Sequence, residues 1–433
     1  MNSSQLPHPH TLDTLAALSQ ETDYDPDSMS VDHARAFIRR CMEPMCSVER
    51  VHLRDALGRV LAENIVSAIA VLGFDNAAMD GYALRFADMV RGQETRLQRI
   101  GVSFAGHPFS GEVGAGQCLR IFTGAMMPRG ADTVVMQERT REEKGVAILA
   151  PDAVTHEGQN RRFAGEDIAP GVTVFTRGQR LRAPELGMLA SLGIAEVPVY
   201  RKLRVAFFST GDELVSFDAT PAAGQIYDSN RYALYGMLQQ LGVEPMDMGI
   251  VPDQPEALEA ALTAAAAHAE VVITSGGVSV GEADFIKAML ERLGKVLFWK
   301  IAMKPGRPLA YGMIGNAHFF GLPGNPVSAM AVFYQFVREA LLVLQGQAPV
   351  MPLPTFRAAL TTPVKKAPGR TEFQRGVCEM KDGQSVVTPI PTQGSNILSS
   401  MSRANCFIVL PMDSGNQPAG TVVEVQPFDG LMG

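Results

Sequence analysis

The alternation of apolar and polar positions is clearest in the second half of the chain. Between residues 203 and 347, runs of β-branched and aromatic residues alternate with segments of helical spacing, and the run from Val271 to Thr274 leads into Gly276 and Gly277. An unbroken apolar run that stops at glycine is typical of a strand buried on both faces of a parallel sheet. The pattern therefore predicts a doubly wound α/β domain over residues 203–347, with functional loops at the carboxyl ends of its strands.

The other regions have shorter and more irregular apolar runs. Residues 71–157 contain brief strand-like segments separated by glycine-rich turns, which predicts an inserted β-rich domain, and residues 350–433 predict a C-terminal β domain. The segments 29–70 and 158–202 flank the insertion and are expected to form one scaffold domain. Residues 1–28 are polar and contain several prolines, so we expect a flexible arm there. The predicted fold class is multidomain α/β plus β.

The composition indicates a globular protein with several domains. The 433 residues are 46% apolar and 19% charged, which is enough apolar material for more than one core. The formal charge of −7 comes without a block of Lys and Arg, so we expect no binding to nucleic acid or to an anionic membrane. Five cysteines without metal spacing, and the lack of a leader-like or membrane-spanning run, lead us to expect a reduced, cytoplasmic protein.

Acidic residues follow several strands of the predicted sheet. Asp212, Glu213 and Asp253 each come after an apolar run, and Asp284 lies in the glycine-rich loop SGGVSVGEAD. The carboxyl ends of parallel strands meet at one edge of a sheet, and Mg²⁺ takes one or two carboxylates together with phosphate oxygens. These acids together predict a magnesium site. Taken alone, Asp212, Glu213 or Asp253 is better explained as a helix cap, and the glycines have the alternative explanation that they relieve crowding in a tight turn.

Basic residues and a helix start follow in the next two loops. Lys300 and Lys304 precede a Pro-Gly-Arg-Pro turn that contains Arg307. Asn325 and the proline after it form a start signal for a long apolar helix, and Ser328 lies in its first turn. Free helix N–H groups beside ammonium groups favour an anion, so this region predicts an oxyanion pocket. As an ordinary lysine pair, the two lysines would instead be a solvated strand end.

Nine segments follow one another in order from about residue 30: FDNAAMDGYAL, TGAMMPRGADTVVMQE, GQNRRFAGEDI, FFSTGDEL, QIYDSNRYAL, SGGVSVGEADF, FWKIAMKPGRP, GLPGNPVSAM and QGSNILSSM. Together they resemble the MoeA family of molybdopterin molybdenumtransferases, which is related to the C-terminal part of gephyrin. The resemblance implies Mg²⁺-dependent insertion of molybdate into adenylyl-molybdopterin with release of AMP. It also implies an elongated homodimer of four-domain subunits, with an active cleft between the α/β domain and parts of the partner chain.

The resemblance also assigns site residues. The positions that match the family's active-site residues are Asp80, Thr123, Glu213, Asp253, Asp284, Lys300 and Lys304. Arg375 and Ser395 are matched in segments of variable spacing, where Arg370 competes with Arg375. The resemblance implies that Glu213, Asp253 and Asp284 hold the metal. It further implies that Asp80 and Thr123 position the pterin, although their own sequence context predicts only local turn bonding.

Two other functions compete with molybdenum insertion. A molybdopterin adenylyltransferase domain resembles residues 203–347, but its loop typically runs SGGTG before an Arg-Asp pair, unlike SGGVSVGEAD here. A non-catalytic scaffold of the gephyrin kind is the second alternative. Departures from the family pattern, Ala77 in place of a common Ser and Met126-Met127 in place of a more Pro-like pair, affect local turns. The expected partners are adenylyl-molybdopterin, molybdate and a second copy of the chain, with molybdopterin adenylyltransferase and molybdoenzyme chaperones as further candidates.

Overall fold

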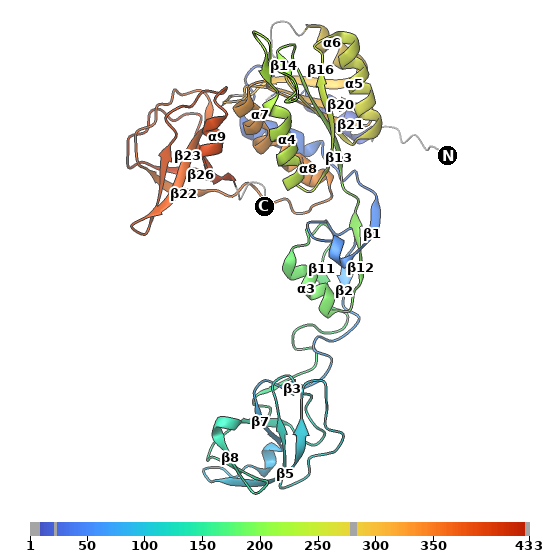
Figure 1. Ribbon diagram of the computed structural model, residues 1–433, viewed down its shortest axis with the longest axis vertical. Helices are drawn as coiled ribbons and strands as arrows, with labels where there is room; N and C mark the ends of the chain where they lie inside the picture. The colour runs from blue at the N-terminus through green and yellow to red at the C-terminus, as the bar shows by residue number, and fades with distance from the viewer. Residues whose placement is uncertain (1–8, 21–23, 278–283, 429–433) are drawn as a thin grey trace, which may run out of the picture.

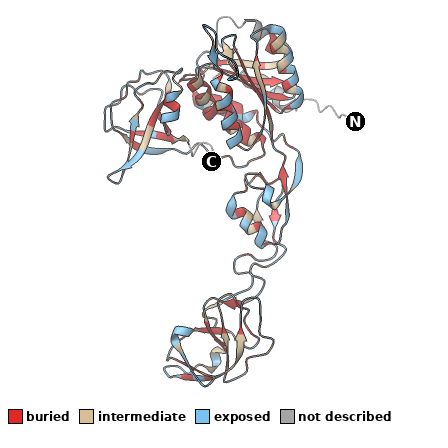
Figure 2. Cartoon of the chain, in the orientation of Figure 1, coloured by how far each residue is buried: buried red, intermediate tan, exposed pale blue. Residues whose placement is uncertain are grey.

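Four parts follow one another along an elongated shape in the computed structural model, which describes residues 9–20, 24–277 and 284–428 (Figure 1). The α/β domain and the C-terminal β domain lie side by side at one end, the inserted β domain lies at the other end, and the scaffold lies between them. Each part buries apolar residues of its own (Figure 2). The predicted fold class, multidomain α/β plus β, is confirmed.

A six-stranded sheet forms the centre of the α/β domain. The strands β16, β13, β17 and β21 are parallel, whereas β20 runs antiparallel to its neighbours β21 and β18. The sheet is therefore mixed, with the antiparallel pairings confined to one side. In order across the sheet, the strands are β16 (Glu244–Val251), β13 (Arg204–Thr210), β17 (Val271–Ser275), β21 (Ala317–Leu322), β20 (Pro308–Ile314) and β18 (Gly294–Lys300).

Alternate residues of the central strands face two separate cores. Val205 and Phe207 of β13 belong to one buried cluster, and Ala206 and Phe208 belong to the other. Since side chains alternate across a strand, helices cover both faces of this sheet. The first face carries α2 (Val31–Arg40), α4 (Ser229–Gln240), α7 (Pro326–Val332) and α8 (Arg338–Leu344), and the second carries α5 (Pro255–His268) and α6 (Asp284–Leu293).

The segment that begins at Pro326 forms one long helix. A π-helical stretch, η4 (Phe333–Val337), joins α7 to α8, so the apolar helix extends to Leu344 as predicted. Within the part of the chain that the structure describes, Pro326–Leu344 is one helix long and apolar enough to cross a membrane by length and composition alone. Because 83% of its most apolar window is buried inside the protein, it has the character of a core helix.

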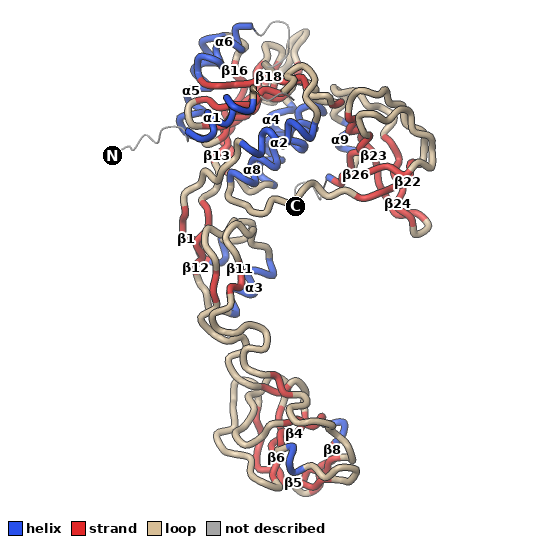
Figure 3. The backbone as a smooth tube through the Cα atoms, turned by 180° about the vertical axis from the view of Figure 1, so that it is seen from behind, coloured by secondary structure: helices blue, strands red, loops and turns tan. Residues whose placement is uncertain are grey.

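The first described residues pack against the α/β domain. Helix α1 (Pro9–Leu18) brings Leu15 and Leu18 into the same buried cluster as α2, and both side chains are at most 1% exposed. Figure 3 shows α1 and α2 on this domain from behind. This part of the chain therefore differs from the expected flexible arm, because leucines three positions apart give α1 an apolar face to bury.

Strands from both sides of the insertion pair with each other in the scaffold. Here β1 (Val48–His52) pairs with β12 (Glu196–Tyr200) and β2 (Ile65–Val66) with β11 (Thr173–Phe175), all antiparallel, beside η1 (Leu53–Asp55) and α3 (Ala183–Ser191). The chain thus leaves along one strand of each pair and returns along the other.

The inserted domain is a six-stranded sheet at the end of this scaffold. In order, its strands are β7 (Thr133–Met136), β4 (Gly81–Leu84), β6 (Gln117–Ile121), β5 (Thr95–Ser103), β9 (Val146–Leu149) and β8 (Thr140–Glu143). The short pair β3 (Asn76–Ala77) and β10 (Arg161–Arg162) joins the entering and leaving chains, and single 3₁₀ turns occur at η2 (Phe86–Asp88) and η3 (Gln137–Arg139).

The C-terminal domain is a small closed barrel. Its strands pair in a ring because β23 contacts both β24 and β25. A strand from the α/β domain, β19 (Met303–Lys304), pairs with β23 and joins the two domains. The barrel consists of β23 (Thr371–Lys381), β24 (Gln384–Pro389), β22 (Phe356–Leu360), β26 (Val422–Pro427) and β25 (Cys406–Leu410), with α9 (Ser399–Arg403) beside it.

Candidate active site

A cavity of about 1090 Å³ opens at the carboxyl edge of the α/β sheet. Its walls come from the loops after β13, β16 and β17, from the starts of α4 and α7, and from a loop of the C-terminal barrel. This is the edge at which the sequence pattern places functional loops. Among the predicted site residues, the cavity is lined by Glu213, Asp253, Asn325 and Ser328.

The acidic wall forms where two strand ends approach each other. Gly276, just after β17, has a φ of +95°, and a Cβ there would come 2.3 Å from the carbonyl oxygen of Thr210 at the end of β13. Only glycine allows this approach. It brings the loop that carries Asp212 and Glu213 against the floor of the cavity, and the backbone N–H of Asp253 donates to Asp212 Oδ1 at 3.4 Å.

Three carboxylates from two loops, those of Asp212, Glu213 and Asp253, therefore line one cavity. Within the described residues, no three His, Cys, Asp or Glu side chains converge closely enough to enclose a metal ion. The carboxylate oxygens of the acidic wall are hard donors and fit Mg²⁺, which needs only one or two carboxylates when phosphate oxygens and water complete its coordination shell. The side chain of Asp284, the third predicted metal ligand, lies outside the described residues.

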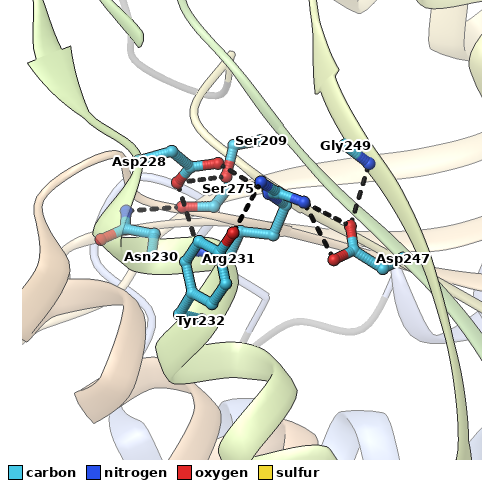
Figure 4. A network of polar contacts seen from close by, with 8 residues as sticks. All are labelled: Ser209, Asp228, Asn230, Arg231, Tyr232, Asp247, Gly249 and Ser275. Atoms are coloured by element: carbon cyan, nitrogen blue, oxygen red, sulfur yellow. Dashed lines mark hydrogen bonds and ion pairs between the residues drawn. The ribbon is translucent and has the colours of Figure 1, made fainter. Parts of the chain in front are cut away.

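A buried polar network supports the wall beside these acids (Figure 4). Asp228 caps α4 by accepting from the Arg231 backbone N–H at 3.2 Å, and it also accepts from Ser209 Oγ at 3.0 Å and from Arg231 Nε at 3.2 Å. The other end of the guanidinium, Nη1, donates to both carboxylate oxygens of Asp247 at 2.9 and 3.0 Å. The network fixes the first turn of α4 to the sheet.

Asn230 connects two walls of the cavity and was missed by the sequence analysis. Its Nδ2 donates to Ser275 Oγ and to the Gly324 carbonyl oxygen, both at 2.7 Å. Asn230, Ser275 and Gly324 all line the cavity. The signal was the segment QIYDSNRYAL, in which Asp228, Ser229 and Asn230 stand together at a helix start.

The start of α7 forms the opposite wall. Asn325 is the N-cap residue of α7, and its side chain accepts no capping hydrogen bond from the backbone of the first turn. The backbone N–H of Val327 donates to the Ser395 carbonyl oxygen at 3.1 Å, so the barrel loop occupies one of the helix donors. Ser328 lines the same cavity, although only 5% of the residue is exposed. The wall retains polar groups and the positive end of a helix dipole.

The predicted basic residues lie outside the lining of the cavity. Lys300 is the last residue of β18, and its ladder partner Pro308 lines the cavity. The Lys300 Nζ, however, donates to Asp27 Oδ1 at 2.6 Å. Lys304 lies in β19 with its Nζ 3.6 Å from Glu372 Oε1. Arg307 is exposed in the turn between β19 and β20. The sequence analysis placed these groups in the pocket, whereas the structure places carboxylates beside both lysines.

Arg375 is the clearest correction among the predicted binding residues. It is only 1% exposed inside the barrel, where burial lowers the pKa of its guanidinium to about 10. The guanidinium donates to Ser400 Oγ at 3.0 Å, to the Thr392 carbonyl at 3.3 Å and to the Gly394 carbonyl at 3.1 Å. Arg375 therefore acts on the cavity only through the loop that it holds. In that loop, the Ser395 carbonyl oxygen accepts from the Val327 N–H at the start of α7.

Asp80 and Thr123 contact each other at the far end of the molecule. The Asp80 carboxylate Oδ1 accepts from the Thr123 backbone N–H at 2.8 Å and from its hydroxyl at 2.7 Å, and these donors lower the pKa of Asp80. Both residues belong to the inserted domain, whereas the cavity belongs to the opposite end of the elongated chain (Figure 1). Within one chain they do not reach the cavity.

Comparisons with known proteins cover nearly the whole chain. Residues 29–193 match the MoeA N-terminal region (domain I and II), residues 206–343 match a probable molybdopterin binding domain, and residues 357–428 match the MoeA C-terminal region (domain IV). The chain is 46% identical over 407 residues to a molybdopterin molybdenumtransferase of Haemophilus influenzae, covering 94% of this chain and 100% of that protein.

More distant relatives agree with this assignment. A molybdopterin molybdenumtransferase of Bacillus subtilis is 34% identical, with 87% of this chain and 89% of that protein covered. Gephyrin of Dictyostelium discoideum is 31% identical over 91% of this chain and 61% of its own length. The crystal structure of a molybdopterin biosynthesis moeA protein from Pyrococcus horikoshii OT3 superposes with a TM-score of 0.80 at 30% identity, covering 93% of this chain and 100% of that one. The predicted resemblance is thereby confirmed, and the chain belongs to the MoeA family of molybdopterin molybdenumtransferases.

Proposed function

We propose that the chain inserts molybdate into adenylyl-molybdopterin with release of AMP, and that the cavity at the carboxyl edge of the α/β sheet holds the reacting groups. The observation that carries this proposal is the opposition of two walls in one cavity, carboxylates on one side and the start of α7 on the other. A substrate with a pyrophosphate group and an oxyanion needs both a seat for a divalent cation and donors for negative oxygens.

The acidic wall is proposed to hold Mg²⁺ through Glu213 and Asp253, with Asp284 as a predicted third ligand. When bound, Mg²⁺ would offset the charge that develops as the P–O bond to AMP breaks. The residues of the opposite wall, Asn325 and Ser328 with the α7 backbone, are proposed to bind anionic oxygens. Lys300, Lys304 and Arg307 would supply further positive charge from the rim.

A second copy of the chain is proposed to complete the site. Asp80 and Thr123 are matched to the family's active-site residues, yet they lie at the far end of the chain from the cavity. Near them in sequence, Phe74, Met79 and Met126 are each more than 40% exposed, as expected of a surface that meets another one. We therefore propose a homodimer in which the inserted domain of one subunit reaches the cavity of the other. Binding to molybdopterin adenylyltransferase and to molybdoenzyme chaperones stays a prediction.

A cytoplasmic location is proposed from the cysteines. All five are unpaired, and Cys41, Cys46, Cys118 and Cys406 are buried. Free thiols in this number are usual in reducing compartments.

The activity can be tested directly. Purified protein is incubated with adenylyl-molybdopterin, Mg²⁺ and molybdate, and we expect AMP release that depends on both ions. Adenylation of molybdopterin by ATP would instead favour an adenylyltransferase, and the absence of both reactions would favour a scaffold. Glu213→Gln should abolish AMP release while leaving the far-ultraviolet circular dichroism unchanged.

Mixed dimers test the shared cavity. Asp80→Ala and Glu213→Gln are each expected to be inactive alone. When both chains are unfolded and refolded together, a heterodimer has one cavity in which Glu213 of one subunit meets Asp80 of the other, so activity should return. If mixing restores nothing while both variants dimerise, the shared site is refuted.

A further inference from the structure

A short segment before α2 lies along the end of β18 and is called here the strap, residues 24–29. Met29 forms a parallel bridge with Ile301, and Ala302 N donates to the Met29 carbonyl oxygen at 2.7 Å. The backbone N–H of Lys300 donates to the Pro26 carbonyl oxygen at 2.8 Å, and Met29 N donates to the Lys300 carbonyl oxygen at 3.2 Å. The strap therefore forms hydrogen bonds with both the backbone N–H and the carbonyl oxygen of Lys300.

Core side chains hold the strap in place. The Tyr24 hydroxyl accepts from Trp299 Nε1 at 3.0 Å, and its ring centroid lies 5.9 Å from that of Phe37. Met29 is 1% exposed within the main buried cluster. Because both ends of the strap are anchored, the residues between them have a defined position beside β18.

The position of the strap places Asp27 on the Lys300 ammonium. Lys300 Nζ donates to Asp27 Oδ1 at 2.6 Å, and the Asp27 backbone N–H donates to Asp25 Oδ1 at 2.9 Å, which fixes the turn. The Lys300 and Asp27 side chains are 37% and 74% exposed, so the pair adds little to stability. The pair instead sets the direction of the Lys300 side chain. Lys300 is the ladder partner of Pro308, which lines the cavity, while the Lys300 ammonium is held by the strap.

We propose that Asp27 is a positioning residue for Lys300. The Asp27 carboxylate holds the Lys300 ammonium at the cavity rim and competes with an incoming oxyanion for that ammonium. This inference rests on the proposed function, in which Lys300 serves the oxyanion. An ammonium group that pairs with a carboxylate is less available to a second anion, so the strap lowers oxyanion affinity in the resting protein. Binding then requires the Asp27–Lys300 contact to open.

The test uses the full-length protein and molybdate alone as the probe. Dissociation constants are measured by equilibrium dialysis, and the fluorescence of Trp299, the one tryptophan of the chain, reports movement of the strap. Asp27→Asn should bind molybdate about two- to fivefold more tightly, the range expected for an exposed ion pair. Asp27→Glu should restore affinity toward the wild-type value. The KM for molybdate in AMP release should fall by the same factor as the dissociation constant.

The matched control is Asp13→Asn, which removes the same charge from an exposed position of α1 and should leave molybdate affinity unchanged. In a Lys300→Ala background, Asp27→Asn should have no effect, because its partner is gone. The inference is overturned if Asp27→Asn matches Asp13→Asn, or if its effect persists without Lys300. If the wild-type protein releases no AMP while Asp27→Asn still tightens molybdate binding through Lys300, the proposed function fails and the strap contact stands.

Discussion

Replacing Arg231 by methionine should destabilise the α/β domain and test whether the network in Figure 4 supports the cavity. Methionine keeps much of the apolar stem of arginine and the backbone N–H that Asp228 uses as a helix cap. It removes the guanidinium that lies between Asp228 and Asp247. The Asp228 carboxylate would then be left buried without a positive partner.

The expected magnitude follows from burial at the two ends of the network. The Asp228 side chain is 1% exposed, and removing one partner of a buried ion pair costs about 3–5 kcal/mol. The Ser209 hydroxyl and the cap N–H remain as donors to Asp228, which favours the lower end of that range. The Asp247 side chain is 35% exposed and regains water, so this contact adds at most about 1 kcal/mol. We expect a loss of about 3 kcal/mol, or about 6–12 °C in the melting temperature of the domain.

The assay is urea unfolding followed by Trp299 fluorescence, because Trp299 is 2% exposed in β18 of the same sheet. Asp228→Asn keeps a good helix cap but removes the buried charge, so the double variant Asp228→Asn, Arg231→Met should lose less than the sum of the two single losses. A loss below about 1 kcal/mol for Arg231→Met, or strict additivity in the double variant, would refute the argument.

Arg375→Met should lower the free energy of unfolding of the barrel by about 2–3 kcal/mol, because buried carbonyls lose their donor, and calorimetry that shows no change would contradict this. Thr123→Val should raise the pKa of Asp80 toward its ordinary value, measured by NMR titration of the carboxyl carbon. The ionised Asp80 contributes folding stability at pH values above its ordinary pKa, and this stability is lost as the pH falls through the lowered pKa. The variant should therefore lose less folding stability on acidification than the wild-type protein. An equal loss would argue against a contribution of the Thr123 hydroxyl to the lowered pKa. Gly276→Ala should abolish AMP release, since its Cβ would meet a β13 carbonyl at 2.3 Å, and retained turnover would show that the loop relaxes cheaply.

Part of the candidate site could be predicted because strand ends have a common edge. Glu213 and Asp253 follow parallel strands, and Asn325 opens the helix after another, so topology alone brings them to one cavity. Asn230 and Ser275 were missed because their importance lies in a hydrogen bond across 45 residues of chain. Such a bond leaves no periodic trace in the sequence.

The basic residues show what local patterns cannot reveal. Lys300 lies beside Asp27, which is 273 residues away in sequence, and Lys304 lies beside Glu372 on a barrel strand. Arg375 resembles an exposed arginine by its neighbours, yet barrel closure buries it. In each case the charge is encoded locally, whereas the partner is supplied by a distant segment.

The sequence by itself determined the fold class, the α/β domain with its loops at one edge, the long apolar helix and the family. These follow from hydrophobic periodicity, turn residues and ordered motifs, all of which act over a few neighbouring positions. Only the tertiary structure decided which charges face the cavity, that the strap holds Lys300, and that Asp80 lies at the far end of the chain. The physical reason is that electrostatic pairing depends on distance in space, and the folded backbone sets that distance independently of spacing along the chain.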